Sequence, residues 1–430
     1  MKQLDYSFLG IRQSIYSMLI CFICFAFLSC DYPQKSPKEK AAINAESILG
    51  NPSYPAISYG GYRGTSRDIQ PTLVQLQNDI KILHAMGIRV LRTYDLQFDH
   101  SPNLLKAIDA LQKEDPSFEM YVILGSWIDC KGAWTDQRDH SVGAIENNTL
   151  EMEKAVRLAN QYPHIVKVIA VGNEAMVHWQ EAYYVKPDVI LKWVNHLQGL
   201  KKKGKLPTDL WITSSDNFAS WGGGDDSYHL DALTQLIKAV DYLSIHTYPF
   251  HDTHYNEDFW VTKNNENASK EESIEAAMIR AVAYAIGQYN AVKNHLATLG
   301  VDKPIHIGES GWSTASEGFY GDNGSHAADE YKQALYYQKI QEWSKQNNIT
   351  TVYFSAFDEQ WKDPNGPLAS ENNFGLFTID GKAKYALWPL VDKGVFKGLS
   401  REENGPQINK TFEGNLQKVL AKSKAPKTKA

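Results

Sequence analysis

The sequence predicts a single (β/α)8 barrel, an α/β fold in which eight parallel strands alternate with helices. Eight apolar runs of strand length lie between residues 50 and 400. Amphipathic stretches of helical length separate several of these runs, as such a barrel requires. No glycine-rich phosphate loop follows the first run, which argues against nucleotide binding. A doubly wound sheet is the alternative fold, although such sheets rarely need eight units.

The expected strands are runs of five to nine residues bounded by polar or turn-forming residues. They cover residues 56–60, 88–94, 118–125, 165–172, 210–215, 240–248, 304–309 and 350–357. The expected helices show apolar residues at helical spacing. They cover residues 68–87, 148–163, 186–205, 271–299 and 327–348. We expect Asp68 to cap the first helix and Gly87 to end it.

The N-terminal segment is expected to direct export and not to join the fold. Residues 1–29 are the expected signal peptide. Lys2 and Arg12 precede the apolar run SIYSMLICFICFAFLSC, Ser14 to Cys30, which is typical of a secretory signal. Its end resembles a bacterial lipobox, so Cys30 is the expected lipid attachment site. An uncleaved anchor is the alternative, but the run is short for a membrane span. We therefore expect a lipid-anchored protein of the bacterial cell envelope, at the outer membrane or cell surface.

The remaining chain divides into three expected segments. Residues 30–50 are polar and contain Pro and Lys, as in a flexible tether. Residues 51–400 form the catalytic barrel, and residues 401–430 form a C-terminal tail. From Lys418 the tail is basic, and we expect this end to be frayed and solvated. With Cys30 lipidated, Cys130 is the only other cysteine after cleavage, so the fold has no internal disulfide.

The composition narrows the classes of partner. The net charge of −6 argues against binding a polyanion such as nucleic acid. The 11 Trp, 23 Tyr and 16 Phe exceed the needs of an ordinary core and suit a groove that stacks on the flat faces of sugar rings. An aromatic-rich core is the alternative interpretation. We expect the protein to act as a monomer.

Two glutamates end strands at the expected mouth of the barrel, where the chemistry of such folds collects. Glu174 ends the fourth strand and Glu309 ends the seventh, across the mouth. Two carboxylates that flank one bond are what glycoside hydrolysis needs: one attacks the anomeric carbon and the other protonates the leaving oxygen. Arg92 and Tyr248 are expected to keep Glu309 ionised. Asn173 could hold a sugar 2-hydroxyl. A solvated or salt-bridged rim is the alternative for each glutamate alone.

The strand-end motifs VGNEAM, HTYPF, GESGWST, FDEQWK and FGLF resemble those of glycoside hydrolase family 17, the β-1,3-glucanases. They recur in the family's order across about residues 54–380. The resemblance implies that Glu174 is the general acid/base and Glu309 the nucleophile of a retaining enzyme. Ser313 is a departure, because the family commonly has Pro there. The loop after the sixth strand is long and polar, which leaves substrate length open.

The resemblance and the strand ends together give a set of expected substrate-binding residues. Trp312 and Trp361 are expected to stack on sugar rings, while Glu359, Lys362 and Glu371 tune charge and hold sugar hydroxyls. The full set is Asn173, Tyr248, Trp312, Arg92, Tyr94, Glu359, Lys362, Glu371, Trp361 and Tyr59. For a retaining enzyme the two catalytic carboxyls should lie roughly 5–5.5 Å apart.

Three functions are compatible with these residues. The first is hydrolysis of laminarin-type β-1,3-glucan, and the second is transglycosylation by the same two glutamates. The third is a surface-tethered lipoprotein that only binds glycan, which would not need Glu174 and Glu309. We expect no cofactor, because the carboxylates perform the chemistry. The stretch HDTHYNED, His251 to Asp258, matches no metal-ligand spacing and is more typical of a polar lid.

Overall fold

The computed structural model describes residues 43–262 and 268–428, which belong to one compact unit beginning at Ile43. The predicted signal segment, Cys30 and most of the predicted tether lie outside the described residues. Within the described ranges, no helix is both long enough and apolar enough to cross a membrane.

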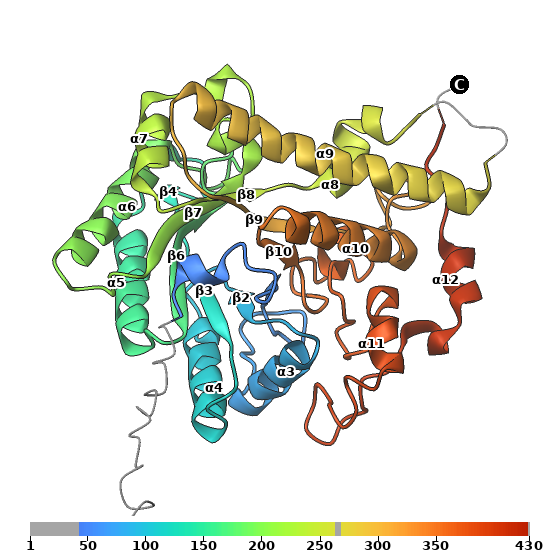
Figure 1. Ribbon diagram of the computed structural model, residues 1–430. Helices are drawn as coiled ribbons and strands as arrows, with labels where there is room; N and C mark the ends of the chain where they lie inside the picture. Colours follow the sequence, from blue (N-terminus) through green and yellow to red (C-terminus); the bar gives the residue numbers. More distant parts are fainter. Residues whose placement is uncertain (1–42, 263–267, 429–430) are drawn as a thin grey trace, which may run out of the picture. The chain divides into compact units, whose positions relative to one another are not determined.

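Eight parallel strands close into the predicted barrel, in the order β1-β10-β9-β8-β7-β6-β3-β2 (Figure 1). Each predicted strand is present, with shifted ends. The strands are β1 Ala56–Ser58, β2 Val90–Arg92, β3 Tyr121–Ser126, β6 Val166–Asn173, β7 Trp211–Asn217, β8 Leu243–His246, β9 Ile305–Gly311 and β10 Thr351–Phe354. Ala56 of β1 pairs with both Val90 and Val352, which closes the ring. The strand residues are almost all buried, because helices cover the barrel from outside.

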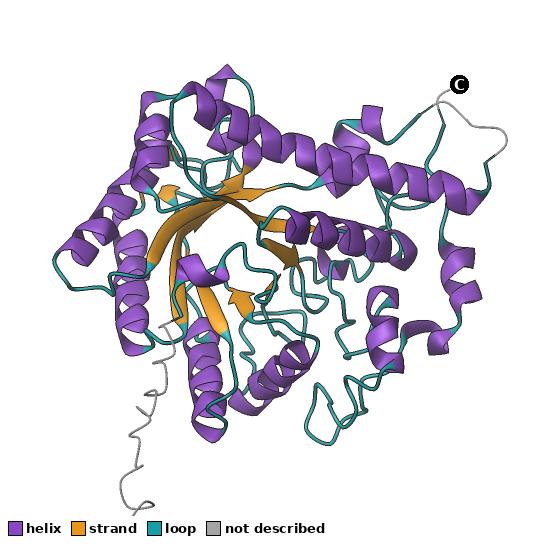
Figure 2. Cartoon of the chain, viewed as in Figure 1, coloured by secondary structure: helices purple, strands orange, loops and turns teal. Residues whose placement is uncertain are grey.

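Helices surround the barrel strands (Figure 2), and the five predicted helices are present. The first begins later than expected: Thr72 caps it by accepting a hydrogen bond from Gln75 N at 3.2 Å, so the role given to Asp68 is wrong. The principal helices are α2 Ala45–Ile48, α3 Leu73–Ala85, α4 His100–Glu114, α5 Ile145–Gln161, α6 Pro187–Lys202, α7 Asp231–Ala239, α8 Pro249–Tyr255, α9 Lys270–Thr298, α10 Glu330–Gln346, α11 Trp388–Asp392 and α12 Leu416–Lys422. Helices α4 and α7 were not predicted, since α4 opens with His-Ser-Pro-Asn and α7 has only nine residues.

Two further elements differ from the sequence-based expectation. A small antiparallel hairpin, β4 (Cys130–Lys131) and β5 (Asp139–Gly143), lies in the connection after β3. Its strands are too short and polar to show strand periodicity. The stretch HDTHYNED was expected in a loop, but its first five residues, His251–Tyr255, complete helix α8, whose first residue is Pro249.

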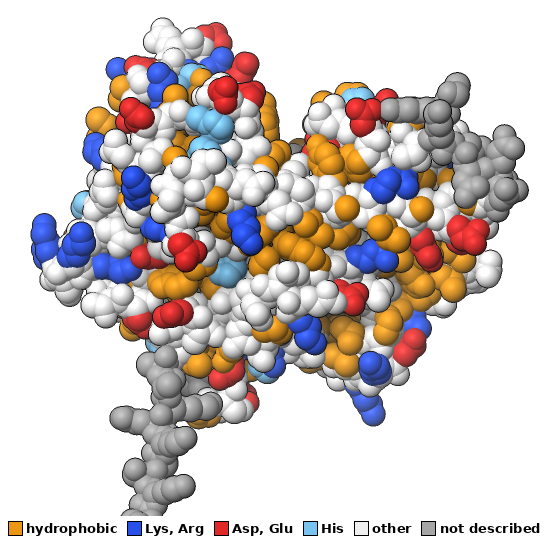
Figure 3. All heavy atoms as spheres, turned by 45° about the horizontal axis from the view of Figure 1, so that its top comes forward, with side chains coloured by type: hydrophobic (Ala, Val, Ile, Leu, Met, Phe, Trp, Pro, Cys, Tyr) orange, Lys and Arg blue, Asp and Glu red, His pale blue; other side chains and the backbone are white. Residues whose placement is uncertain are grey.

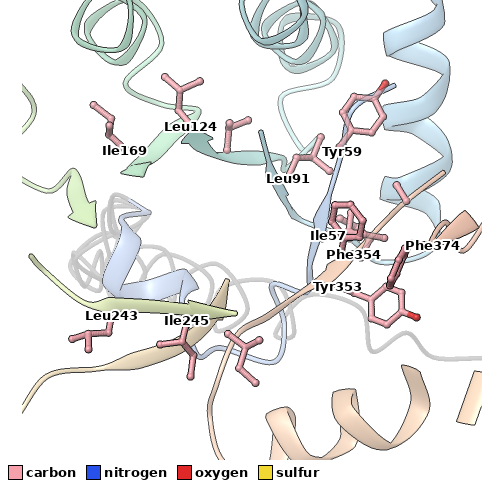
Figure 4. Close-up of a cluster of buried hydrophobic side chains, with 14 of the residues drawn as sticks. Ile57, Tyr59, Leu91, Leu124, Ile169, Leu243, Ile245, Tyr353, Phe354 and Phe374 are labelled. Carbon is pink, nitrogen blue, oxygen red and sulfur yellow. The ribbon is translucent and has the colours of Figure 1, made fainter. Parts of the chain in front are cut away.

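The apolar core lies along and around the barrel wall (Figure 4), where Leu91, Leu124, Ile169 and Ile245 are fully buried. A second buried cluster closes the N-terminal end of the barrel. There Ala45 and Ile48 of α2, and Leu49 directly after it, pack on residues near the starts of strands. Those residues include Ala56, Val90, Tyr121, Val168 and Val352. The chain after residue 43 therefore plugs the barrel end opposite to the carboxyl ends of the strands, and it is not a tether up to residue 50.

The C-terminal segment also packs on the barrel. Arg401 is 2% exposed, and its Nε lies 3.2 Å from Asp79 of α3. Ser423, just after α12, is buried and donates a hydrogen bond to Asp329 Oδ2 at 2.9 Å. We expected the chain from Lys418 onward to be frayed, and this is wrong for residues 418–423. The buried Val419 and the hydrogen bond of Ser423 to Asp329 hold this segment on the barrel. The packed unit does not end at residue 400.

Candidate active site

A cleft of about 1570 Å³ lies at the carboxyl ends of the barrel strands. Residues that end or follow five different strands line it: Tyr59, Tyr94, Glu174, Tyr248 and Glu309. The volume exceeds the roughly 300–1,000 Å³ of typical small-molecule pockets. The cleft therefore has room for several units of a polymer at once, and both predicted catalytic glutamates lie in it.

Glu309 on β9 is almost completely buried, at 6% exposed, and is surrounded by donors. Arg92 forms an ion pair with its Oε1 oxygen, and the Tyr248 hydroxyl donates to Oε2 at 2.6 Å. His246 Nε2 lies 3.8 Å from Oε1. Burial by itself would raise the pKa of Glu309, but His246, Arg92 and Tyr248 hold this pKa well below its ordinary value. The two supports predicted for an ionised Glu309 are in place.

Arg92 lies beneath the cleft and does not line it. Its side chain is 1% exposed, and its Nη2 donates to Asn173 Oδ1 at 2.7 Å. The expected direct contact with substrate is wrong, because β2 directs this guanidinium into the barrel, toward Glu309. Arg92 thus links Glu309 to Asn173. Tyr94, which lines the cleft, has its ring 4.6 Å from the same guanidinium.

Glu174 follows β6 in a left-handed backbone conformation, with φ of +44°. This conformation is uncommon for a residue other than glycine and often marks a functional position. Its backbone N–H donates to Ser215 O at 3.0 Å, and its side chain is 21% exposed. The Oε1 oxygen lies 3.0 Å from His246 Nδ1. Glu174 and Glu309 therefore contact the two nitrogens of one imidazole ring, so they face the same site.

A third acid, Asp216 on β7, lies beside Glu174 and is fully buried. Its two oxygens accept hydrogen bonds from the backbone N–H groups of Met176 and Asn217, at 2.7 and 2.8 Å. Burial raises the pKa of Asp216, and the neighbouring Glu174 carboxylate raises it further, to about 7. Neither Asp216 nor His246 was predicted to be functional. Their positions at the ends of the fifth and sixth strands were the available signal.

The loop after β10 supplies a charged and aromatic wall. Glu359 is 6% exposed and lies 3.9 Å from Lys362 Nζ, as the sequence suggested. Burial raises the pKa of Glu359, and Lys362 opposes the rise. A Cβ atom at Gly60 would lie 1.9 Å from Glu359 Oε1, so a larger residue there would displace this carboxylate. Trp361 also lines the cleft.

Two other residues predicted to bind substrate, Glu371 and Tyr59, differ in how far their polar groups are exposed to the cleft. Glu371 lies at the rim, with its side chain 49% exposed and 3.7 Å from His251 of α8. Tyr59 is buried, and its hydroxyl donates to Asp79 at 2.9 Å. Tyr59 therefore stiffens the cleft wall and does not present a hydroxyl to a ligand.

Trp312 is not a stacking surface, contrary to expectation. It is fully buried, its Nε1 donates to Ala327 O at 2.7 Å, and its ring packs against Phe250 and Trp260. Side chains alternate along a strand, so a residue three positions after the inward Glu309 points outward. Four other tryptophans that follow strand ends do line the cleft: Trp127, Trp134, Trp179 and Trp361.

The described residues contain no group of three His, Cys, Asp or Glu side chains placed to hold a metal ion. His251 and Asp252 of α8 instead line the cleft near Glu371. On the face shown in Figure 3, Lys and Arg side chains are interspersed with Asp and Glu.

Comparisons with known proteins agree with this geometry. The sequence-family model of the BtgE/BtgC glycoside hydrolase domain matches residues 56–375 of this chain. The chain is similar to an endo-laminarinase from Formosa Hel1_33_131, with 57% identity, a TM-score of 0.88, and coverage of 90% of this chain and 98% of that one. No curated protein sequence matches the chain.

Two solved structures of a β-1,3-glucanosyltransferase from Rhizomucor miehei are more distant, and one of them is assigned to glycoside hydrolase family 17. They share 19–20% identity and TM-scores of 0.52–0.53 with this chain, over 78% of its length and 96% of theirs. At this identity the likeness supports the fold alone.

Proposed function

The chain belongs to the BtgE/BtgC glycoside hydrolase family, and on that premise we propose that it hydrolyses laminarin-type β-1,3-glucan at internal bonds with retention of configuration. One observation carries the proposal: Glu174 and Glu309 face the same imidazole, but Glu309 is buried with Arg92 and Tyr248 as partners while Glu174 is more exposed. Such a difference assigns the acid and the nucleophile among paired carboxyl groups. The 57% identical endo-laminarinase supports the choice of substrate and the internal attack.

The first chemical step uses both glutamates. The ionised Glu309 attacks the anomeric carbon, and the glycosidic bond breaks as Glu174 transfers its proton to the leaving oxygen. Arg92 and Tyr248 hold Glu309 in place while its charge is consumed. The product of this step is a glycosyl-enzyme ester on Glu309 and a free glucan end.

The second step returns the enzyme to its starting state. Glu174, now a carboxylate, removes a proton from water, and the water oxygen attacks the anomeric carbon and displaces Glu309. Two inversions at one carbon give net retention. Asn173 Oδ1 is already occupied by Arg92, which orients its amide nitrogen as the donor available to a sugar hydroxyl.

Transglycosylation differs only in the second step, where a sugar hydroxyl replaces water. A protein that only binds glycan would gain nothing from keeping Glu309 ionised at the cost of burying it with Arg92. We therefore favour an enzyme over a binding protein, and hydrolysis over transfer because the similar Formosa protein is an endo-laminarinase.

We also propose that lipid on Cys30 anchors the protein in the bacterial envelope. The support is the basic and apolar N-terminal segment that ends in Phe27-Leu28-Ser29-Cys30. Incorporation of labelled fatty acid into the wild type, and its absence from Cys30→Ala, would test this. A monomeric state is proposed as well, to be checked by light scattering.

The direct test of the function is digestion of laminarin by the chain from Ile43 onward, beside Glu309→Gln. Short oligosaccharides of several lengths from the first protein, and none from the second, are expected for internal hydrolysis. A single short product from the start would contradict internal attack. Products longer than an oligosaccharide substrate would identify transglycosylation, and tight binding without turnover would leave only a binding protein.

A further inference from the structure

The β4–β5 hairpin carries a tryptophan in an unusual position. Trp134, in the turn of the hairpin, is 65% exposed and lines the cleft. Its φ of +64° lies in the left-handed region, which bulky side chains rarely adopt. The tight turn before it depends on Gly132, where a Cβ atom would lie 2.2 Å from Gln137 O. The chain thus holds a large apolar side chain out of the core in a backbone conformation that disfavours it.

The hairpin is fixed to the loop that follows Glu174. Trp134 N donates to Ala182 O at 2.8 Å, and Cys130 N donates to Tyr183 O at 3.1 Å. From the other side, Lys186 N donates to His140 O of β5 at 2.8 Å. These contacts join the hairpin to both ends of residues 182–186. The hairpin and the loop of the acid/base therefore form one rigid wall of the cleft.

Aromatic rings are assembled on this wall. The Trp134 ring stacks on Tyr183, with centroids 5.2 Å apart, and Tyr183 also contacts Trp127 at 4.9 Å. The Trp127 indole donates to the buried Asp129 at 2.6 Å. Hydrogen bonds from the indoles of Trp127 and Trp134 lower the pKa of Asp129 against the larger effect of its burial, which raises it. The rings are thus held in place before any ligand arrives.

Exposed aromatic side chains are otherwise rare in the part of the chain that the structure describes. The four large ones are Trp134, Trp179, Tyr255 and Phe319, and the first three line the cleft. Trp179 lies on the same loop after Glu174. An exposed, pre-ordered aromatic surface in a cleft favours binding of a flat apolar face. Covering the surface with such a face releases water, and no protein side chain has to be ordered for it.

We propose that Trp134, supported by Tyr183, Trp127 and Asp129, is a binding platform for the glucan unit on the leaving-group side of the cleaved bond. The side follows from the chemistry: Glu174 must reach the departing oxygen, and the platform is hydrogen-bonded to the loop of Glu174. The ligand class is a β-linked glucosyl unit presenting its apolar ring face. This assignment rests on the proposed function and adds the residue that selects substrates extending beyond the cut.

The experiment compares two substrates in the chain from Ile43 onward. Laminarihexaose places sugars on both sides of the cut, whereas β-laminaribiosyl fluoride has only a fluorine atom on the leaving side and so no ring to stack there. Trp134→Ala should lower kcat/KM for the hexaose about tenfold and leave that for the fluoride nearly unchanged. Trp134→Tyr, which keeps an aromatic face, should retain most of the activity on the hexaose. Unchanged turnover of the fluoride also shows that Trp134→Ala is folded.

Phe319→Ala is the matched control, because Phe319 is 54% exposed but does not line the cleft, and its activity should equal the wild type on both substrates. Equal losses on both substrates in Trp134→Ala, or no loss on the hexaose, would overturn the platform while the wild type still cleaves laminarin. A wild type inactive on laminarin and on the hexaose would overturn the proposed function itself, and the platform with it.

Discussion

Glu309 and Glu174 differ in burial and in the groups that partner each carboxylate. Glu309 is buried against Arg92 and accepts from Tyr248, so its negative charge is compensated within the barrel. Glu174 is more exposed and has a second carboxyl, Asp216, among its neighbours. An opposite charge and a donated hydrogen bond favour the ionised form of a carboxyl group. Glu309 has both, from Arg92 and Tyr248, which suits it to act as the nucleophile.

His246 makes this comparison informative, because it contacts both carboxylates from one position. Its Nε2 also lies 2.8 Å from Ser215 Oγ, which fixes the ring from the side opposite to Glu174. The shared imidazole cannot by itself distinguish the two glutamates. The difference between them therefore comes from Arg92 and Tyr248, which partner Glu309, and each of these can be changed separately.

The largest expected effect is that of Glu309→Gln, which removes the nucleophile and keeps its shape. We expect kcat on laminarin to fall by more than the roughly 10²–10⁴-fold that acid–base residues contribute. Because no covalent intermediate forms, a substrate with a good leaving group should not restore the rate. Reducing-sugar release and nitrophenol release measure the two cases. Restoration of the rate with a nitrophenyl laminaribioside would contradict the assignment.

Glu174→Gln should cost less, and the loss should depend on the leaving group. On laminarin kcat is expected to fall by about 10²–10⁴-fold, since the departing alkoxide then receives no proton. A nitrophenyl leaving group needs little protonation, so the first step should be much less affected. A burst of nitrophenol followed by slow turnover is the expected signature in stopped-flow absorbance. The same loss on both substrates would show that Glu174 has another role.

Arg92→Met tests what keeps Glu309 ionised. Without the cation, the pKa of Glu309 is expected to rise, which moves the acidic limb of the kcat/KM profile to higher pH. Breaking a buried ion pair on one side also destabilises the fold by about 3–5 kcal/mol, measurable by urea denaturation. Tyr248→Phe should move the same limb in the same direction by less, with a stability loss of about 1 kcal/mol. An unchanged limb in Arg92→Met would refute the electrostatic account.

The smallest expected effect is that of Asp216→Asn. This variant tests how the free energy of unfolding depends on pH. The folded-state pKa of about 7 lies above the unfolded value of about 3.9, so Asp216 contributes stability below pH 4 that is lost as pH rises through 7. The Asn variant lacks this loss. Its stability relative to the wild type should therefore improve between pH 4 and pH 8, whatever the cost of the altered hydrogen bonds. A constant difference across this range would contradict the raised pKa.

Much of this architecture is readable in the sequence because buried parallel strands are short apolar runs and polar residues follow them. That rule singled out Glu174 and Glu309 as candidates, the resemblance to glycoside hydrolase family 17 assigned their roles, and Tyr248 and Arg92 were correctly associated with Glu309. The sequence does not show whether a residue just after a strand faces the cleft or the outside of the barrel. Trp312, which is buried, was therefore wrongly predicted to line the cleft.

Long-range contacts were the other gap. The ion pair of Arg401 with Asp79 joins positions more than three hundred residues apart, and no local sequence pattern predicts it. The β4–β5 hairpin is short and polar, so the position of Trp134 depends on its hydrogen bonds to residues 182–186. The role of His246 similarly depends on two strands meeting at one imidazole.

The anomeric configuration of the first product tests the central claim most directly. Proton NMR can follow a fresh reaction of the chain from Ile43 onward with laminarihexaose, before the product anomers interconvert. If Glu309 is the nucleophile and Glu174 the acid/base, the β-anomer must accumulate first and the α-anomer must follow by mutarotation. First appearance of the α-anomer would mean a single displacement by water, and the roles assigned to both glutamates would be wrong.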